Sequence, residues 1–173
     1  YDQGKKDKAL EYYNKALDFR LNKLGKDHPD VASSYNNIGL VYDDQGKKDE
    51  ALDYYNKALD IYLNKLGKNH YVVASLYNNI GLLYADQGKK DKALKYYNKA
   101  LDIRLNKLGK DHPLVATSYN NIGRVYYDQG KKDKALEYCN KSLDIELKKL
   151  GKDHPDVAIS YHNIAAIYEE QGN

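Results

Sequence analysis

The chain has 173 residues, 42% of them hydrophobic and 31% charged, which is typical of an ordered soluble domain and argues against disorder. Its 28 basic and 25 acidic residues leave a net charge of +3, too balanced for a dedicated polyanion-binding protein unless the charges segregate. The single cysteine, Cys139, excludes an internal disulfide framework, and no run approaches the roughly 18 consecutive apolar residues of a membrane span. We therefore expect a cytoplasmic protein without a secretory signal.

The sequence repeats with a period of 42 residues. The string Asp-Gln-Gly begins at Asp2, Asp44, Asp86 and Asp128, and Glu170 starts a related fifth copy, with no insertion or deletion between copies. More than half of the columns are identical in all four copies. A stack of equivalent modules can use the same residues repeatedly, whereas an enzyme needs different residues at different positions. The repeat therefore predicts stacked modules and argues against catalysis.

Each copy contains two segments with apolar residues at the three- and four-residue spacings of one helical face. In chain order, we expect helices over residues 7–24, 29–44, 49–66, 71–86, 91–108, 113–128, 133–150 and 155–170. We call the first, third, fifth and seventh of these B-type helices and the others A-type helices. Pro29 stands where a first-turn proline is tolerated, and Gly46 follows where a left-handed cap is needed. Asp49 is the expected N-cap of the next B-type helix, which Gly67 ends.

The connections between these helices are about four residues long, which makes sequential helices antiparallel neighbours. Because one hairpin cannot bury both of its faces, we expect the copies to stack on one another. The predicted fold is all-α, an α-solenoid of eight helices that forms a single domain over residues 1–173. Small residues let helix axes approach closely, and tyrosines fill the remaining gaps. The predicted stacking core consists of Tyr35, Gly39, Tyr42, Ala51, Tyr55, Ala58, Tyr77, Gly81, Tyr84, Ala93, Tyr97, Ala100, Tyr119, Gly123 and Tyr126.

The recurring residues resemble the tetratricopeptide repeat. The resemblance rests on a tyrosine four residues before a helical glycine and on the small and aromatic residues that follow. In the first full copy these are Tyr35, Gly39, Tyr42, Gly46, Ala51, Tyr55 and Ala58, with Tyr35 where the family commonly has tryptophan. The 42-residue unit is similar to the extended repeats of kinesin light chain and of fungal and bacterial arrays. The resemblance implies a right-handed superhelix whose A-type helices line a concave groove, and a protein- or peptide-binding scaffold without naming the partner.

If the tyrosines of an A-type helix face the core, the residues on its opposite side line this groove. Asparagine recurs there, and a row of amides could hold the main chain of an extended peptide. The alternative is that each asparagine is polar filler or bonds its neighbour in the row. Leu40 and Leu82 favour a groove. The predicted groove residues are Ser33, Asn36, Asn37, Leu40, Asp44, Ser75, Asn78, Asn79, Leu82, Asp86, Asn120, Asn121, Arg124, Asp128 and Asn163, and the same row includes Thr117, Ile159, His162, Ala166 and Glu170.

The predicted groove is neutral to acidic. The A-type helices contain no lysine and only one arginine, Arg124, whereas Asp44, Asp86 and Asp128 gather at their ends. Family members that take acidic cargo motifs, or that clamp a terminal carboxylate, use lysine and arginine in the groove. We therefore expect a neutral or basic peptide, with electrostatics mainly steering the encounter. The lysines lie in the turns without an aromatic platform, so we do not expect nucleic acid binding, and we expect no membrane contact.

No residue pattern indicates catalysis, a cofactor or a metal. A histidine recurs once per copy, at His28, His70, His112 and His154, but equivalent atoms of neighbouring copies are expected about 10 Å apart, too far to share a zinc ion. We predict that these histidines cap or pack against the A-type helices. Cys139 replaces a tyrosine of the other copies and is expected to be a small buried hydrophobe rather than a nucleophile. We predict that the protein is not an enzyme.

The ends of the chain favour a second class of function. Because the sequence contains no Met, we expect it to be a piece of a longer repeat array. Its terminal helices lack the polar substitutions that usually protect a solenoid end, as Leu17 and Ile159 illustrate. We predict head-to-tail self-association through these uncapped ends. The functions to be separated are thus a protein-interaction scaffold and a structural, self-assembling spacer.

Overall fold

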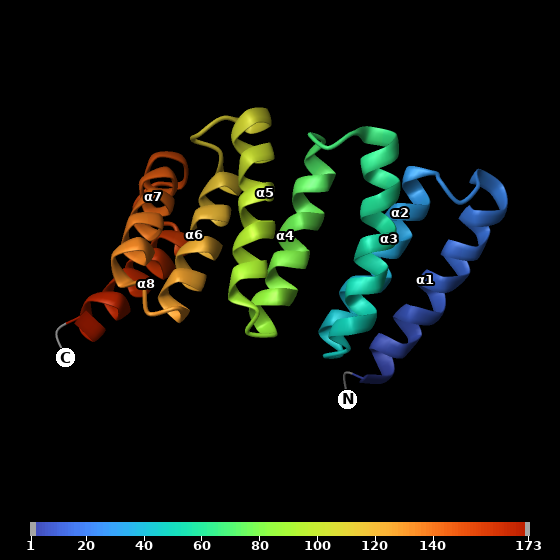
Figure 1. Cartoon of the computed structure of the whole chain (residues 1–173), viewed down its shortest axis with the longest axis horizontal. Helices are drawn as coiled ribbons and strands as arrows, with labels where there is room; N and C mark the ends of the chain where they lie inside the picture. Colours follow the sequence, from blue (N-terminus) through green and yellow to red (C-terminus); the bar gives the residue numbers. More distant parts are fainter. Residues whose placement is uncertain (1–2, 172–173) are drawn as a thin grey trace. The chain divides into compact units, whose positions relative to one another are not determined.

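A computed structural model of the chain describes residues 3–171, and the regular structure in that range is entirely α-helical, as predicted (Figure 1). The B-type helices are α1 (Gln3–Leu24), α3 (Lys48–Leu66), α5 (Lys90–Leu108) and α7 (Lys132–Leu150). The A-type helices are α2 (Pro29–Asp44), α4 (Tyr71–Asp86), α6 (Pro113–Asp128) and α8 (Pro155–Gln171). Asp2 and Gly172, from the first and last copies of the repeated motif, lie outside the described residues.

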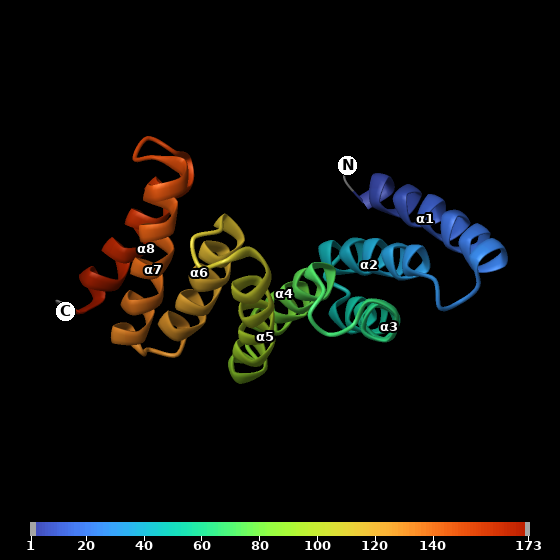
Figure 2. The ribbon, with the colours of Figure 1, turned by 90° about the horizontal axis from the view of Figure 1, so that it is seen from above.

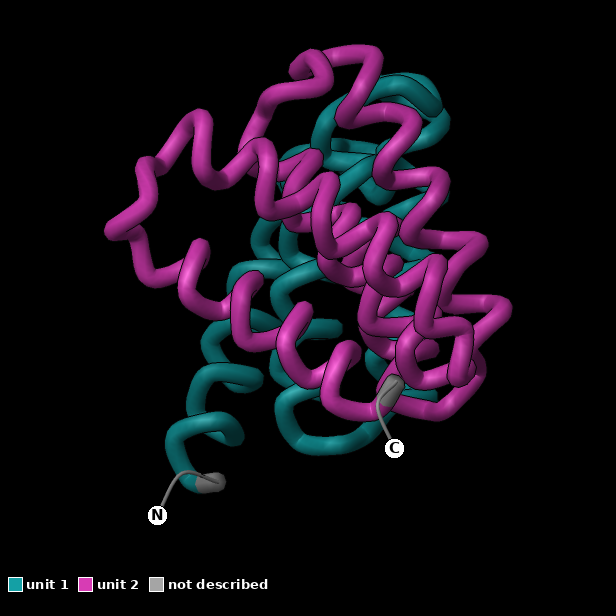
Figure 3. The backbone as a smooth tube through the Cα atoms, turned by 90° about the vertical axis from the view of Figure 1, so that its left-hand side faces the viewer, with its two compact units in different colours: residues 1–76 teal, residues 77–173 magenta. Residues whose placement is uncertain are grey.

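The chain divides into two compact units, residues 1–76 and residues 77–173, with the division inside α4 (Figure 3). In the first unit, α2 packs against both α1 and α3. In the second unit, α6 packs against α5 and α7, and α7 packs against α8, which lies beside it in Figure 2. Each of these pairs consists of helices that follow one another in the sequence, as the short connections require. That residues 1–173 form a single solenoid stays a prediction.

A histidine caps the start of each A-type helix. His28 Nδ1 accepts a hydrogen bond from the backbone N–H of Asp30 at 3.1 Å, and Pro29 occupies the first turn. The same bond is accepted by His70, His112 and His154, at 3.4, 3.1 and 3.2 Å. Such a cap satisfies an N–H group that the helix leaves without a partner. The predicted capping role of the histidines is confirmed.

The predicted N-cap of the B-type helices is wrong. α3 begins at Lys48, and its N-cap residue, Lys47, makes no side-chain hydrogen bond. The backbone closes this turn instead, because Lys47 N–H donates to the carbonyl oxygen of Tyr42 at 2.9 Å while Gly46 adopts a φ of 76°. Asp49 lies in the first turn of α3, where its charge complements the positive end of the helix dipole.

Side chains of α1 hold the end of α2. Gln45, the C-cap of α2, donates through Nε2 to Asp7 Oδ1 at 3.1 Å, and Lys6 Nζ donates to the carbonyl oxygen of Asp44 at 2.9 Å. In the second unit, equivalent bonds join Gln129 to Asp91, Lys90 to the carbonyl oxygen of Asp128, and Lys132 to that of Glu170. A cation at a helix C-terminus binds carbonyl groups that lack helical partners. These turn lysines therefore have a structural role that the sequence analysis did not predict.

Tyrosines of the A-type helices pack against a tyrosine of the following B-type helix. The Tyr54 ring stacks on Tyr42, with centroids 5.4 Å apart, and its centroid lies 6.0 Å from that of Tyr35. Lys57 Nζ lies 4.8 Å from the Tyr54 centroid. The second unit repeats this triplet with Tyr77, Tyr84 and Tyr96, and with Tyr119, Tyr126 and Tyr138. Such aromatic and cation–π contacts explain much of the tyrosine content of the chain.

Two charged side chains, which occupy the same column of the repeat, are buried between a B-type helix and the next A-type helix. Arg104 is 5% exposed and donates through Nη1 to the carbonyl oxygen of Leu114 at 3.0 Å and to Ser118 Oγ at 2.7 Å. Glu146 is 7% exposed and accepts a hydrogen bond from Ser160 Oγ at 2.6 Å. Burial lowers the pKa of Arg104.

A second tyrosine of α3 and of α5 lies directly on the glycine of the preceding A-type helix. A Cβ atom built on Gly39 would lie 2.8 Å from Cδ1 and Cε1 of Tyr55, and one built on Gly81 would lie 2.7 Å from Cδ1 of Tyr97. Both rings are buried. Glycine is therefore required by the close approach of the ring, and this contact compensates for the roughly 0.5–1 kcal/mol that a glycine costs inside a helix.

The buried ring of Tyr97 also makes the fold sensitive to alkaline pH. Burial raises the pKa of Tyr97 to about 12, an effect that the Arg124 guanidinium opposes and the Asp86 carboxylate reinforces. In the unfolded chain, a tyrosine ionises near pH 10. Between these two values, the unfolded chain has released a proton that the folded chain retains, so the free energy of unfolding falls as the pH rises.

Alanine at the three helical glycines is expected to destabilise the fold unequally. In Gly39→Ala and Gly81→Ala, the new methyl group meets a buried ring, and overpacking of this kind costs about 1–3 kcal/mol. In Gly123→Ala its shortest contact is with Cys139 Sγ, at 2.9 Å, and that small side chain borders open space, so we expect a smaller loss. Thermal unfolding followed by circular dichroism measures the difference. Equal melting temperatures for Gly81→Ala and Gly123→Ala would contradict this account.

Tyr97→Phe removes the tyrosine titration from the core. We expect the free energy of unfolding of this variant to decline less steeply than that of the wild type between about pH 10 and about pH 12. The reason is that the unfolded variant lacks the Tyr97 hydroxyl, whose ionisation stabilises the unfolded wild type. Urea unfolding at a series of alkaline pH values gives the two slopes. Tyr161→Phe, at an exposed position of α8, is the matched control and should keep the wild-type slope. Parallel curves for the wild type and Tyr97→Phe would be the contrary result.

Candidate functional site

The predicted groove residues all lie on the surface of the A-type helices. None of them is buried: the asparagines are half-buried, while Leu40, Asp44, Arg124 and Asp128 are exposed. In the first unit, the row follows α2 from Ser33 to Asp44. Ser75, on the first part of α4, also belongs to this unit, and in the second unit the row follows the rest of α4, α6 and α8. These side chains are therefore accessible to a ligand, and their role as a groove stays a prediction.

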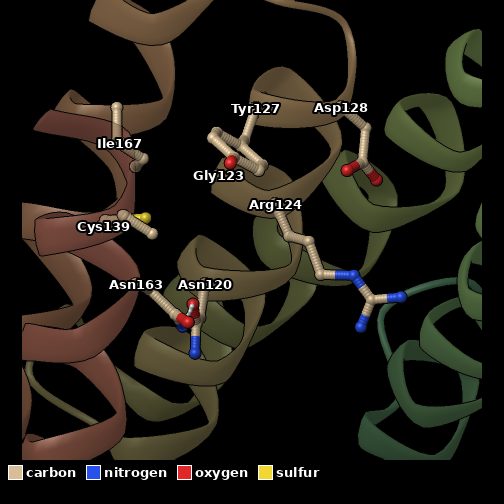
Figure 4. Close-up of a pocket in the computed structure, with 9 residues that line it drawn as sticks. Asn120, Gly123, Arg124, Tyr127, Asp128, Cys139, Asn163 and Ile167 are labelled. Atoms are coloured by element: carbon tan, nitrogen blue, oxygen red, sulfur yellow. Dashed lines mark hydrogen bonds between the residues drawn. The ribbon is translucent and has the colours of Figure 1, made fainter. Parts of the chain in front are cut away.

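Asparagines of neighbouring A-type helices are hydrogen-bonded in pairs in the second unit. Asn121 Nδ2 donates to Asn78 Oδ1 at 3.0 Å. Asn163 Nδ2 donates to Asn120 Oδ1 at 3.4 Å, and Figure 4 shows these two side chains next to each other. We call them the asparagine pairs. The alternative that asparagines bond their neighbours is confirmed for these four residues, yet each bond uses only one donor and one acceptor of the two amides, so capacity for a ligand is left.

Charged groups beside the asparagine pairs are themselves engaged. Arg124 Nη2 on α6 lies 3.9 Å from Asp86 Oδ1 on α4. Tyr127 donates a hydrogen bond to Glu170 Oε1, and this bond raises the pKa of Tyr127. Because Arg124 is the only basic residue other than histidine in the A-type helices, the surface around the pairs has more carboxylates than cations.

A pocket of about 240 Å³ lies between α6, α7 and α8 in the second unit (Figure 4). Its lining includes Asn120, Gly123, Tyr127, Cys139, Asn163 and Ile167. Cys139 is 3% exposed, and burial, reinforced by the charge of Glu146, raises the pKa of its thiol. The thiol is therefore a poor nucleophile, as the sequence predicted. The second asparagine pair borders the pocket, whereas Arg124 extends away from Cys139 in Figure 4.

The pocket arises where the fourth copy departs from the repeat. Cys139 replaces the tyrosine found at Tyr13, Tyr55 and Tyr97, and Ala166 replaces a leucine or arginine. Tyr127 stands where the second and third copies have Asp43 and Ala85, whereas the first copy also has tyrosine. From the sequence, Cys139 was predicted only to be a small buried residue, and the pocket was not predicted. The substitution of a large residue by a small one in an otherwise repeated column was the signal that could have revealed it.

Over residues 3–171, no three His, Cys, Asp or Glu side chains come together in a way that could hold a metal ion. None of the described helices combines the length and the apolar character needed to cross a membrane. The accessible chemistry beside the pairs and the pocket is hydrogen bonding by amides and contact with apolar surface.

Comparisons with solved structures find close likenesses. BtubC (BKLC) from P. vanneervenii is 30% identical to this chain and has a TM-score of 0.89, over 99% of this chain and 68% of that one. A putative kinesin light chain from Podosopora anserina with nearly identical TPR-like repeats is 22% identical, with a TM-score of 0.82 over 99% and 81% of the two chains. The apo form of RapI is 20% identical, with a TM-score of 0.82 over 99% and 45%. The last two likenesses show the fold alone.

The sequence itself matches a protein family. The family profile described as tetratricopeptide repeat covers residues 1–64, 72–145 and 133–173. Among the curated proteins, no match was found. The family match extends over nearly the whole chain and agrees with the repeated helical hairpins and with the likeness to BtubC (BKLC). The chain therefore belongs to the tetratricopeptide repeat family.

Proposed function

We propose that this chain is a non-catalytic scaffold that binds an extended, neutral or basic peptide segment of a partner protein along its A-type helices. Membership of the tetratricopeptide repeat family implies a protein–protein interaction scaffold. The observation that carries the proposal further is the pairing of asparagines between neighbouring A-type helices. It supports a surface that recognises the main chain of its ligand.

The asparagine pairs suit a main chain for two physical reasons. Their mutual hydrogen bonds already restrict the amide side chains, so less conformational entropy is lost when a ligand binds. The remaining N–H and C=O groups are of the same kind as those of a peptide backbone, so an extended segment can bind with little dependence on its side chains. The exposed Leu40 and the half-buried Leu82 add apolar contact area on the same row.

Charge selects among peptides. Asp44 and Asp128 are exposed at the ends of the A-type helices, and Arg124 is close to Asp86, so an acidic peptide would meet like charges. A basic peptide would be attracted, mainly through a faster association. We do not propose nucleic acid as a ligand, because turn lysines such as Lys6 are engaged with carbonyl oxygens. A cytoplasmic location is part of the proposal.

The alternative function is that of a spacer that associates with other copies of itself. Two apolar faces favour it: Tyr12 and Phe19 on α1 are 68% and 65% exposed, and Ile159 and Tyr161 on α8 are also exposed. Faces of this kind in near-identical repeats can pack head to tail. Sedimentation equilibrium at high protein concentration tests this alternative, and a monomeric mass throughout would reject it.

Simultaneous substitution of Asn37, Asn79 and Asn121 by alanine separates binding from structure. We expect capture on an array of neutral and basic peptides to weaken about tenfold, equivalent to about 1.4 kcal/mol, because main-chain hydrogen bonds are lost. The melting temperature should fall only slightly. The control variant replaces Asn14, Asn56 and Asn140, which are exposed on B-type helices, and should retain wild-type capture. Equal capture by both triple variants would reject the proposal, and loss of stability without loss of capture would favour the spacer.

The charge preference is tested with two aspartates. Asp44→Asn combined with Asp128→Asn should reduce the capture of basic peptides and leave that of neutral peptides unchanged, because only the former gain from the carboxylates. Added salt should reduce the same difference, since exposed charges are screened. Binding of the wild type to acidic peptides in preference to basic ones would overturn this part of the proposal.

A further inference from the structure

We infer that the pocket over Cys139 receives one aromatic side chain of the bound partner. This side chain would occupy the place where the other copies of the repeat have a tyrosine ring of their own. The inference rests on the proposed function, because it assigns a side-chain subsite to the surface that holds the peptide. It concerns the second unit alone, where residues of α6, α7 and α8 line the pocket.

The preceding copies of the repeat identify the occupant. Tyr55 and Tyr97 place a ring against the glycine of the preceding A-type helix, within 2.8 Å of where a Cβ atom would stand on Gly39 or Gly81. The third A-type helix keeps this glycine as Gly123, but the side chain that the fourth copy places beside it is Cys139. The backbone has therefore kept the space for a ring, while the side chain that fills it elsewhere has become small. What fits this space in the protein itself is a phenol ring.

The size and lining of the pocket support an aromatic guest. Its volume of about 240 Å³ exceeds the roughly 150 Å³ at which an apolar protein cavity accepts benzene. Ile167 and Cys139 are buried parts of one apolar cluster, and Tyr127 packs against this cluster. An aromatic ring would gain apolar contact with these side chains on leaving water.

Tyr127 lines the pocket, but its hydroxyl is bound elsewhere. It donates a hydrogen bond to Glu170, which joins α6 to α8 and restrains the ring. The pocket of about 240 Å³ is what remains with Tyr127 in this position. Tyr127 is thus a wall of the pocket rather than the substitute for the missing ring, and it offers an aromatic surface to a guest.

The pocket adjoins the asparagine pair that would hold the peptide. Asn120 and Asn163, whose side chains are hydrogen-bonded to each other, both line it. A peptide that is bound by this pair through its main chain can therefore direct one side chain into the pocket. The exposed Asp128 also lines the pocket and provides an acceptor for a phenol hydroxyl.

The test uses p-cresol, the side chain of tyrosine, with the whole isotope-labelled chain observed by NMR. We expect saturable shifts at Gly123, Ile167 and the Asn120 and Asn163 amides in the wild type. Cys139→Ser keeps the space and should bind equally, whereas Cys139→Tyr fills it and should weaken binding at least about tenfold. Absence of shifts in the wild type, or equal binding by Cys139→Tyr, would overturn the inference.

A second variant guards against misfolding of Cys139→Tyr. The double substitution Cys139→Tyr with Tyr127→Ala reproduces the local arrangement of the third copy, where Tyr97 lies beside Gly81 with Ala85 nearby in sequence. It should fold with an unchanged circular dichroism spectrum and fail to bind p-cresol. A folded double variant that still binds p-cresol at the same residues would refute the inference.

Peptide capture distinguishes failure of this inference from failure of the proposed function. Among peptides captured by the wild type, those with one tyrosine should bind more weakly when that tyrosine is replaced by alanine. Cys139→Ser should show the same difference in affinity between the two peptides, whereas Cys139→Tyr should bind both peptides equally. If capture depends on the asparagines but never on an aromatic residue, the pocket inference fails and the proposed function stands. If p-cresol binds and no peptide is captured, the proposed function fails while the ring site remains.

Discussion

The contact on which the rest of the structure depends is a buried ring lying on a glycine. Tyr55 on Gly39 and Tyr97 on Gly81 bring an A-type and a B-type helix so close together that a larger residue at the glycine would have to displace the ring. Around this contact, the histidine caps, the backbone-closed turns and the bonds from turn side chains to the end of α2 define where helices start and stop. The packing within one hairpin thus determines which faces of its two helices remain exposed on the surface.

Repetition and departure from repetition have different consequences here. The repeated asparagines form a regular set of amides, suited to the regular main chain of a ligand and indifferent to its sequence. The change to Cys139, together with the small Ala166, removes side-chain volume from a scaffold that otherwise keeps its helices, and so leaves a pocket. Affinity for peptides in general can therefore come from the repeated asparagines, and discrimination among peptides can come from the pocket over Cys139.

Several features followed from the pattern of residues, and others did not. Periodicity, Pro29 and the recurrent histidine indicate helices with capped starts, because these signals act within a few residues of one another. The choice between free and paired asparagines stayed open, because it depends on the separation of two helices. The burial of Arg104 and Glu146 was not foreseen either, since charged residues on a helix are usually exposed and these two depend on hydrogen bonds to the next helix, including those to Ser118 and Ser160.

The sequence by itself determined that this protein consists of repeated helical hairpins of the tetratricopeptide type, because helix formation and capping are local and the copies are nearly identical. Only the tertiary structure decided that Asn120 and Asn163 bond each other, that Lys6 binds the end of α2, and that a pocket opens over Cys139. These outcomes depend on the distance and orientation between helices, which side-chain packing sets and which no spacing along the chain expresses.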